Sequence, residues 1–449
     1  MFRKILIANR GEIAVRIIRA ARELGIATVA VYSTADKEAL HTLLADEAIC
    51  IGPAKSTDSY LNMNAVLSAA VLTEAEAIHP GFGFLSENSK FATMCEEVGV
   101  KFIGPSGAIM DMMGDKINAR AQMIKANVPV IPGSDGEVFT AEEALEVAEK
   151  IGYPVMLKAS AGGGGKGIRK VEKAEDLVAA FESASSEAKA AFGNGAMYME
   201  RVIYPARHIE VQILADQHGH VVHLGERDCS LQRNNQKVLE EAPSVAIGKT
   251  LRQKIGDAAV RAAQSVGYEN AGTIEFLYDE NKGEFYFMEM NTRVQVEHPV
   301  TEMITGIDIV VEQLKIAAGY GLSYHQDEIN IRGHALECRI NAEDPKNFMP
   351  CPGRIDTLFA PSGSGVRFDS HLYQGYTIPS YYDSLIGKLI CHAQTRRQAV
   401  AKMLHALDEL VIEGIKTNIP LHRDVILQDE AFTEEAQNIH YLENHLLKS

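Results

Sequence analysis

A run of alternating polar side chains between residues 289 and 297 is the feature of this sequence best suited to chemistry. Alternate side chains of an extended chain lie on one face, so the spacing predicts a single polar face. That face would carry Glu289, Asn291, Arg293, Gln295 and Glu297. Phe285 and Phe287 share the same parity, so we expect a strand that is buried upstream and opens onto a polar site at Glu289. The alternative is an edge strand with a solvated face.

A further carboxylate, Glu275, stands between large apolar residues in the segment 273–277. A buried anion is costly unless it is paired or binds a cation, so Glu275 requires a partner. Together with Glu289 and Asn291 it would offer the hard oxygen ligands that Mg²⁺ shares with substrate phosphates. The alternative is a buried ion pair, for instance between Glu275 and Arg293.

A glycine loop at residues 162–167, Gly-Gly-Gly-Gly-Lys-Gly, could approach phosphates closely. Its spacing matches G-x-G-x-x-G, but it joins two extended segments, whereas a dinucleotide fingerprint opens a helix. It also lacks the Ser or Thr that follows the lysine of a P-loop. The alternative is a flexible hairpin. Lys116, Lys158 and Lys237 could neutralise a polyphosphate if the fold brings them together, since singly each is more often a surface residue.

The elements that must position these residues follow from the apolar pattern. Between residues 4 and 114, short apolar runs alternate with amphipathic stretches, which predicts a Rossmann-like α/β domain with a parallel sheet. From about residue 116, helices and strands surround the glycine loop in an α+β arrangement. From about residue 333 the chain is rich in strands until a helix over residues 397–410.

Composition narrows the class of protein. The 449 residues correspond to about three domains. Lys+Arg 44 against Asp+Glu 60 gives a formal net charge of −16, which argues against extended contact with nucleic acid or an anionic membrane. Six cysteines without a C-x-x-C pair favour a reducing compartment, the cytoplasm. The N-terminal apolar run is too short for a signal peptide, and no segment approaches the roughly 20 apolar residues of a membrane span.

These motifs together resemble the biotin carboxylase component of the biotin-dependent carboxylases, within the ATP-grasp superfamily, over essentially the whole chain. The resemblance is carried by the glycine loop and by residues 5–14, 79–88, 226–230, 289–302 and 339–345. It implies a Rossmann-like N-terminal domain over residues 1–114 and an ATP-grasp domain over residues 115–332, with a mobile lid at about residues 131–203. A mixed C-terminal biotin carboxylase domain would occupy residues 333–449.

The resemblance also implies roles for particular residues. The residues expected to bind ATP are Lys116, Lys158, Gly164, Gly165, Glu200, Arg201, Val202, Ile203, His208, Asn235, Glu275 and Glu289. The residues expected to hold Mg²⁺ or Mn²⁺ are Glu275, Glu289 and Asn291. Bicarbonate would lie on Lys237, Arg293, Gln295 and the backbone of Val296, with Glu297 as the base. Arg339 would stabilise the enolate-like oxygen of biotin, with Phe82 nearby; the alternative is a structural pair of Arg339 with Glu337 or Glu343.

The implied reaction is the ATP-dependent carboxylation of biotin, in which similar enzymes form carboxyphosphate and ADP and then pass CO₂ to N1 of biotin. We expect a homodimer that works with a separate biotinylated carrier protein and a carboxyltransferase, because the chain ends at Ser449 without a biotinylation segment. The expected setting is acetyl-CoA carboxylase in fatty-acid synthesis. The alternatives are a pyruvate or other acyl-CoA carboxylase, or another ATP-grasp ligase.

Two sites depart from the family pattern. Phe82 stands where a tyrosine is common, which removes a hydroxyl near biotin. Asn234 and Asn235 stand where many members have an Arg-His pair, which reduces the positive charge near the nucleotide. A regulatory scaffold without chemistry is disfavoured by the set Lys237, Arg293 and Glu297. A Rossmann dehydrogenase is disfavoured because the glycine motif lies outside the first domain.

Overall fold

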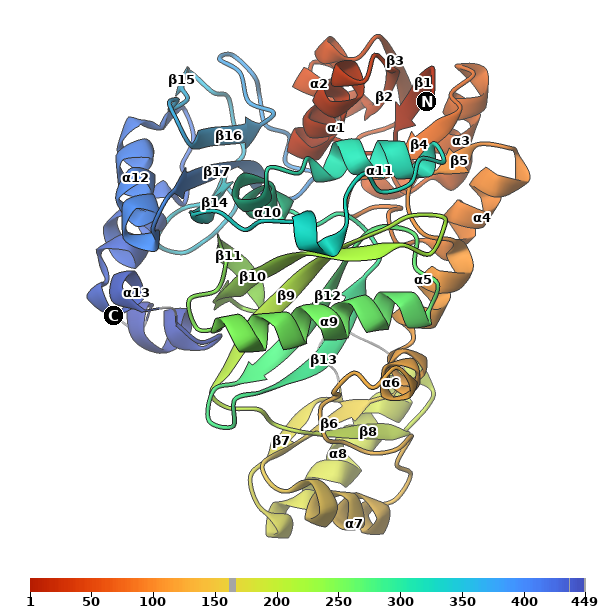
Figure 1. Cartoon of the computed structure of the whole chain (residues 1–449), viewed down its shortest axis with the longest axis vertical. Helices are drawn as coiled ribbons and strands as arrows, with labels where there is room; N and C mark the ends of the chain where they lie inside the picture. Colours follow the sequence, from red (N-terminus) through yellow and green to blue (C-terminus); the bar gives the residue numbers. More distant parts are fainter. Residues whose placement is uncertain (161–166, 436, 448–449) are drawn as a thin grey trace.

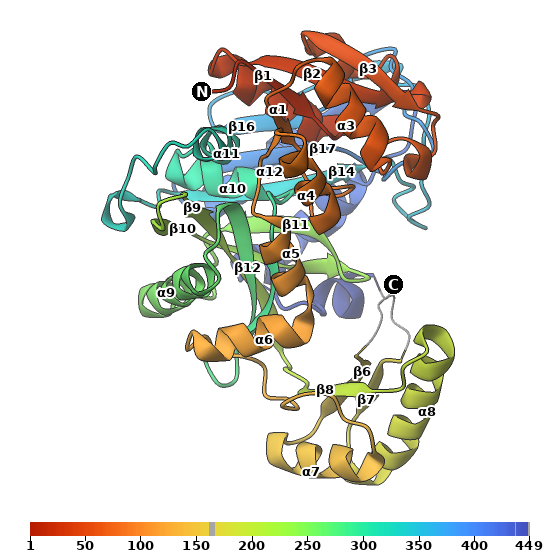
Figure 2. The same cartoon turned by 90° about the vertical axis from the view of Figure 1, so that its right-hand side faces the viewer.

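The computed structural model describes residues 1–160, 167–435 and 437–447 of the chain. The N-terminal region lies toward one end of the long axis and a small subdomain lies at the other, with a large sheet between them (Figures 1 and 2). Among the described helices, none combines the length and apolar character needed to cross a membrane.

The N-terminal region is a parallel sheet in the order β3-β2-β1-β4-β5, flanked by helices. The strands are β1 (Lys4–Ile7), β2 (Ala27–Ser33), β3 (Glu47–Gly52), β4 (Ala77–His79) and β5 (Lys101–Phe102). The helices are α1 (Gly11–Glu23), α2 (Leu40–Leu44), α3 (Met63–Leu72), α4 (Ser89–Glu97) and α5 (Gly107–Gly114). Ile5 and Ile13 are buried in one core, whereas Leu6 is buried in a second core with Val66 of α3. Both faces of the sheet are therefore covered, and the predicted Rossmann-like arrangement is confirmed.

The small subdomain follows α6 (Lys116–Lys125) and has a core of its own, drawn from residues 138–199. Its antiparallel sheet has the order β7-β6-β8. The strands are β6 (Val155–Ala159), β7 (Arg169–Val171) and β8 (Met197–Arg201), and the helices are α7 (Ala141–Ile151) and α8 (Ala174–Phe192). β6 and β7 are antiparallel partners. The glycine loop predicted between them falls mostly on residues 161–166, which lie outside the described part of the chain.

An antiparallel sheet in the order β13-β12-β9-β10-β11-β14-β17-β16 connects the middle of the chain to its last third. Its first members along the chain are β9 (Ala206–Ala215), β10 (Val221–Arg233), β11 (Gln236–Ala242), β12 (Asn270–Asp279) and β13 (Glu284–Asn291). The others are β14 (His334–Asn341), β16 (Val366–Ser370) and β17 (Leu385–Ala393). Leu239 of β11 pairs with Cys338 of β14, so the sheet is continuous across residue 333, where the sequence predicts a domain limit.

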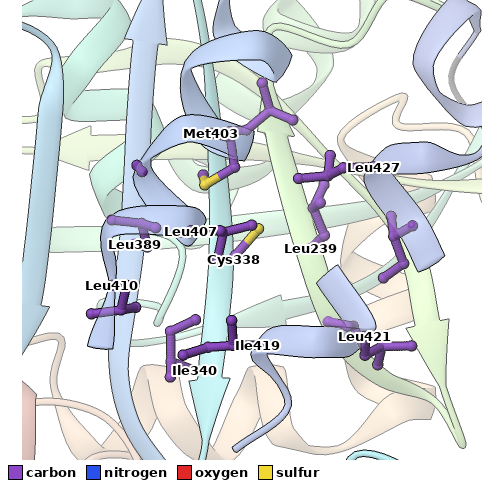
Figure 3. Close-up of a cluster of buried hydrophobic side chains, with 14 of the residues drawn as sticks. Leu239, Cys338, Ile340, Leu389, Met403, Leu407, Leu410, Ile419, Leu421 and Leu427 are labelled. Carbon is purple, nitrogen blue, oxygen red and sulfur yellow. The ribbon is translucent and has the colours of Figure 1, made fainter. Parts of the chain in front are cut away.

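The remaining elements cover this sheet. They are α9 (Lys249–Ser265), α10 (His298–Thr305), α11 (Ile309–Ala317), α12 (Arg396–Glu409), α13 (Glu430–Glu434) and the short pair β15 (Thr357–Phe359) and β18 (Val411–Glu413). Figure 3 shows the apolar core beneath α12, where Met403 and Leu407 meet Cys338 and Leu389. The opposite face of β17 meets α10, where Ile390 packs in a small cluster with other apolar side chains.

The predicted polar face over residues 289–297 is not a single strand. β13 ends at Asn291, and the residues that follow form a turn into α10, which begins at His298. Phe287 pairs with Phe276, but Glu289 pairs with Glu275, which leaves an extra residue in β13 as a bulge. The bulge places Phe287 in the core under α9, on the face opposite Glu289, so the predicted continuity of one face is wrong. β13 is an edge strand, as the alternative held, but its polar face is not solvated throughout, because Glu289 is exposed whereas Asn291 is buried.

Candidate active site

Lys237 lies at the centre of a buried group of acidic and amide side chains. It is the second residue of β11, just after the turn from β10. Its Nζ lies within hydrogen-bonding distance of four acceptors: Glu210 Oε2 at 2.6 Å, Glu275 Oε1 at 3.0 Å, Gln295 Oε1 at 3.2 Å and Glu297 Oε1 at 2.6 Å. Burial opposes the charge, but the carboxylates, Glu210 first, raise the pKa of Lys237 well above its ordinary value. The ammonium is therefore charged at neutral pH.

The turn that precedes Lys237 explains the two asparagines. Arg233 pairs with Gln236, so Asn234 and Asn235 form a two-residue hairpin loop. Both have positive φ, of 50° and 61°. Asparagine tolerates this left-handed conformation better than most residues and is common in such turns. The predicted ATP-binding residue Asn235 is thus an exposed turn residue at the start of β11.

Glu297 lies between two cations that come from different parts of the sheet. Its Oε1 accepts from Lys237 of β11 at 2.6 Å, and its Oε2 accepts from Arg339 Nη2 of β14 at 3.0 Å. Burial by itself raises the pKa of Glu297, but Lys237 and Arg339 outweigh that effect and hold the pKa well below its usual range. The structure thus brings the predicted base together with the predicted biotin contact.

Arg339 is itself held by a second carboxylate. Its Nε donates to Glu240 Oε1 at 2.5 Å. Glu240 is fully buried, and burial raises its pKa to about 7 although Arg339 acts in the opposite direction. The ion pairs of Arg339 are with Glu240 and Glu297, rather than with Glu337 or Glu343 as the structural alternative held.

Glu275 has the partner that its burial requires, but the partner is not Arg293. Its Oε2 lies 2.9 Å from His208 Nε2, and its Oε1 accepts from Lys237. Two amides also donate to Glu275 Oε1: Asn291 Nδ2 at 2.8 Å and Gln295 Nε2 at 3.0 Å. Burial would raise the pKa of Glu275, but His208 and Lys237 lower it well below its usual value.

A cation would fit where Glu275 and Glu289 face each other. The two residues are cross-strand partners on β12 and β13, Glu275 buried and Glu289 exposed. Desolvation, and after it the negative charge of Glu275, raise the pKa of Glu289. A bound cation would relieve this repulsion between the two carboxylates. With the Asn291 amide nearby, the set offers the hard oxygen donors that Mg²⁺ prefers. The residues present therefore fit the predicted metal.

Arg293 lies in the turn after β13, and a carboxylate of the N-terminal region, that of Glu87, orients its side chain. Its Nε donates to Glu87 Oε2 at 2.9 Å, and its Nη2 donates to Asn291 Oδ1 at 3.1 Å. Glu87 also accepts from the backbone N–H of Thr292 at 3.1 Å. One carboxylate of the N-terminal region thus fixes the chain where β13 ends.

The other predicted nucleotide residues lie on the small subdomain and the segment that follows it. Lys158 Nζ of β6 donates to Glu200 Oε2 of β8 at 2.5 Å. Arg201 Nη2 donates to Tyr286 OH at 3.0 Å, the N–H of Val202 donates to the Pro154 carbonyl at 2.8 Å, and Ile203 is buried beside Tyr286. Gly164 and Gly165 lie outside the described residues.

Two predicted residues lie further from the Lys237 group. Lys116 begins α6 and is exposed, and its charge lowers the pKa of Glu289, which places it on the side of the proposed metal ligands. Phe82 is half-buried against the core of the N-terminal region. Its carbonyl accepts from Asn9 Nδ2 at 2.7 Å.

Sequence reasoning missed Glu210, Arg227 and Glu240. Arg227 is fully buried and bonds Glu210, and its Nη1 donates to Gln212 Oε1 at 2.8 Å. A signal for Glu210 was present, because His208, Glu210 and Gln212 alternate with apolar residues in β9. Glu240 had no comparable signal, because its role depends on Arg339, 99 residues away along the chain.

The large antiparallel sheet with buried acids, joined to a separate subdomain that carries a glycine loop, defines the chain as an ATP-grasp enzyme. Three family models match: the biotin carboxylase N-terminal domain at residues 1–110, the ATP-binding domain of the carbamoyl-phosphate synthase L chain at 115–325, and the biotin carboxylase C-terminal domain at 337–444. Biotin carboxylase of Haemophilus influenzae is 56% identical over 447 residues, 99% of each chain. The chain belongs to the biotin carboxylase family, whose members carboxylate biotin with ATP.

Solved structures agree with this membership. A Campylobacter jejuni biotin carboxylase in a β-γ-ATP complex is 51% identical with a TM-score of 0.93, covering 99% of both chains. The biotin carboxylase domain dimer of Hydrogenobacter thermophilus 2-oxoglutarate carboxylase, with MgADP, ADP and bicarbonate, is 51% identical with a TM-score of 0.91. It covers 99% of this chain and 98% of that one.

Proposed function

We propose that this chain carboxylates biotin on a carrier protein with ATP and bicarbonate, as the first half-reaction of acetyl-CoA carboxylase. The observation that carries the proposal is the Glu297 carboxylate, held 2.6 Å from Lys237 Nζ and 3.0 Å from Arg339 Nη2. A base between two cations can accept a proton next to a bound anion, and the cations stabilise the negative charge that develops. The ligands of the solved relatives, which include ATP, ADP and bicarbonate, support these substrates.

We assign bicarbonate to Lys237, Arg293, Gln295 and the backbone N–H of Val296. The lowered pKa of Glu297 keeps its carboxylate ionised at neutral pH but also weakens it as a base. We assign Glu297 as the acceptor of the bicarbonate proton from its position beside Lys237 and Arg339, not from its pKa. The deprotonated oxygen then attacks the γ-phosphorus of ATP, the bond from that phosphorus to ADP breaks, and carboxyphosphate forms. Lys237 neutralises charge on the anion as this occurs.

The nucleotide would lie between the small subdomain and the large sheet. Lys116 and Lys158 would bind its phosphates, and Gly164 and Gly165 would cover them. The adenine and ribose would meet Glu200, Arg201, Val202, Ile203, His208 and Asn235. Glu275, Glu289 and Asn291 would hold Mg²⁺, which supplies charge neutralisation on the transferred phosphoryl group.

Biotin would bind at Arg339, with Phe82 beside it. Carboxyphosphate would break down to CO₂ and phosphate, and the released phosphate would take the proton of biotin N1. Negative charge then moves onto the ureido oxygen, where the Arg339 guanidinium stabilises it, and N1 forms its bond to CO₂. Glu240 supports this role because its hydrogen bond to Nε holds the guanidinium with Nη2 directed at Glu297. The carboxylation step would thus use the part of the site that belongs to β14.

We propose a homodimer, as in the Hydrogenobacter thermophilus domain, that acts with a separate biotinylated carrier and a carboxyltransferase. Acetyl-CoA is our proposed final acceptor, supported by 56% identity to an enzyme named simply biotin carboxylase. The similarity to a 2-oxoglutarate carboxylase domain keeps pyruvate and other acceptors as alternatives. The six unpaired cysteines support a reducing compartment, the cytoplasm.

The test is ADP release by the purified chain with Mg-ATP and bicarbonate, with and without free biotin. We expect release that requires bicarbonate and rises with biotin. Glu297→Ala should abolish this release, and Arg339→Ala should abolish its rise with biotin. Release that ignores biotin but responds to an amine or another acid would instead indicate a different ATP-grasp ligase. Adding separate carrier and carboxyltransferase proteins with acetyl-CoA or pyruvate then identifies the acceptor.

A further inference from the structure

A buried lysine outside the proposed machinery contacts the backbone of the bicarbonate-binding turn. Lys388 lies in β17, directly opposite Arg339 of β14. Its side chain is 0% exposed, and its Nζ lies 3.3 Å from Glu12 Oε1 of α1. The same Nζ donates to the carbonyl of Val296 at 2.6 Å. This one ammonium therefore connects the last third of the chain, the N-terminal region and the turn that precedes α10.

Three buried acidic side chains, Glu12, Asp369 and Glu337, surround Lys388, and Glu12 lies within ion-pair distance of it. Asp369, its cross-strand partner on β16, is already bonded by both arms of Arg367, at 2.8 and 2.6 Å. Glu337 on β14 is fully buried, and neither of its carboxylate oxygens has a hydrogen-bond partner among the described residues. Burial of an ammonium is costly, so a lysine held here needs a bond that uses its charge. The Glu12 carboxylate offsets part of this cost, and the Val296 carbonyl accepts the shorter contact, at 2.6 Å.

The bond fixes the part of the backbone on which the proposed base depends. The Val296 carbonyl belongs to the peptide that joins Val296 to Glu297, so holding it restricts the rotation that would swing the Glu297 side chain. The preceding carbonyl, that of Gln295, lies 2.7 Å from His298 Nδ1. His298 and Lys388 therefore hold the carbonyls of two successive residues, Gln295 and Val296. The next side chain, that of Glu297, lies between Lys237 and Arg339.

We propose that Lys388 is a positioning residue for the turn of Gln295, Val296 and Glu297, and that it sets the affinity for bicarbonate and the rate of its activation. The inference rests on the proposed function, because bicarbonate is the ligand of this turn. A shift of about 1 Å in a group that must meet its substrate can cost on the order of 100-fold in rate. Loss of the Lys388 bond is therefore expected to appear in the kinetics of bicarbonate rather than in those of ATP.

The test compares Lys388→Met with the wild-type chain in bicarbonate-dependent ADP release. We expect the KM for bicarbonate to rise and kcat to fall, each by about 10-fold or more, while the KM for ATP changes less than about twofold. The matched control is Lys402→Met. Lys402 Nζ also donates to backbone carbonyls, those of Ser364 at 2.8 Å and His392 at 2.7 Å, but away from the turn. Its substitution should leave both KM values unchanged.

Further variants keep the proposal open to refutation if Lys388→Met does not fold. Lys388→Gln retains an N–H donor and should restore part of the bicarbonate affinity. Lys388→Met combined with Glu12→Gln removes both charges and should fold while keeping the raised bicarbonate KM. An unchanged bicarbonate KM in a folded variant, an equal rise in the KM for ATP, or failure of all three variants to fold would overturn the inference. If the wild-type chain shows no bicarbonate-dependent ADP release, the proposed function is overturned, and this inference with it.

Discussion

At the scale of single residues, the site depends on buried carboxylates whose pKa values are lowered by neighbouring cations. Glu297→Gln keeps the size of the side chain but removes its negative charge and its ability to accept a proton. We expect bicarbonate-dependent ADP release to fall by about 100- to 10,000-fold, the usual contribution of a general base. Steady-state ADP assays with saturating ATP would measure this.

Glu302→Gln is the matched control for Glu297→Gln. Glu302 is also buried between two cations, accepting from Arg16 at 2.9 Å and from Arg367 at 2.7 Å, but it lies in α10 outside the proposed site. We expect this variant to lose stability and to keep its turnover within about threefold. Equal losses of turnover in the two variants would mean that Glu297 acts through stability and not as a base.

A second prediction at this scale separates the two halves of the reaction. Because the pKa of Glu240 is about 7, the comparison is made at about pH 8.5, where its carboxylate is ionised. In Glu240→Gln the bond to Arg339 Nε then loses its charged acceptor, and hydrogen bonds to charged groups contribute about 1.5–3 kcal/mol. We expect the stimulation of ADP release by biotin to fall about tenfold or more, with a higher KM for biotin. The release measured without biotin should change far less. An equal loss in both assays would contradict the assignment of Glu240 to the biotin side.

At the scale of elements, the strands and helices could largely be predicted from sequence, whereas their register could not. Apolar runs located β1 to β5, and alternation located a polar site near Glu289. The bulge in β13 reversed the parity of Phe287 relative to Glu289, because a bulge is a property of pairing with β12 and leaves no local signal. The site still forms, because the turn after Asn291 places the side chains of Gln295 and Glu297 within hydrogen-bonding distance of Lys237.

Contacts between elements also explain which site residues could not be predicted. Glu275 and Glu289 stand on strands adjacent in sequence, so their pairing could be anticipated. Arg293 could not be matched with Glu87, which lies 206 residues away in the N-terminal region. Sequence patterns report local burial and face, whereas an ion pair between distant elements depends on the packing of the whole fold.

A buried group of ion pairs between β11, β14 and α12 leads to a prediction about the pH dependence of stability. Glu241 of β11 lies 2.7 Å from His334 Nε2 of β14 and accepts from Arg396 Nε of α12 at 2.7 Å. Burial opposes its ionisation, but His334 and Arg396 lower the pKa of Glu241 from 4.5 to about 2. Because the folded pKa is lowered, the stabilisation is complete above pH 4.5 and is lost as the pH falls toward 2.

Glu241→Gln should therefore lower the free energy of unfolding by about 3 kcal/mol at pH 7. The difference from the wild-type chain should shrink as the pH falls below about 4.5. Urea unfolding at pH 7, 5, 4 and 3 would measure it. Glu146→Gln, on the exposed face of α7, is the control and should show no such trend. A difference that stays constant with pH would show that lost packing, and not charge, explains the effect.

At the scale of the whole molecule, the fold joins two predicted domains in one sheet and keeps a third unit apart. β11 and β14 pair across residue 333, and the core beneath α12 includes Leu239 from one side and Cys338 from the other. The small subdomain has a separate core over residues 138–199 and lies at one end of the molecule in both views (Figures 1 and 2). Strands joined by hydrogen bonds in one continuous sheet are expected to lose their protection together, whereas a subdomain with its own sheet and core can open independently.

Native-state hydrogen exchange with increasing denaturant would distinguish these units. We expect the amides of β9 to β12, β14 and β17 to exchange through one opening of high free energy, and those of β6 and β8 to exchange through a smaller one. Mg-ADP should raise the protection of β6 and β8 most, because a ligand stabilises the unit whose opening releases it. Earlier loss of protection in β14 and β17 than in β9 and β12 would contradict the shared unit. Such a result would mean that the limit predicted at residue 333 separates regions that fold independently, despite the hydrogen bonds that cross it.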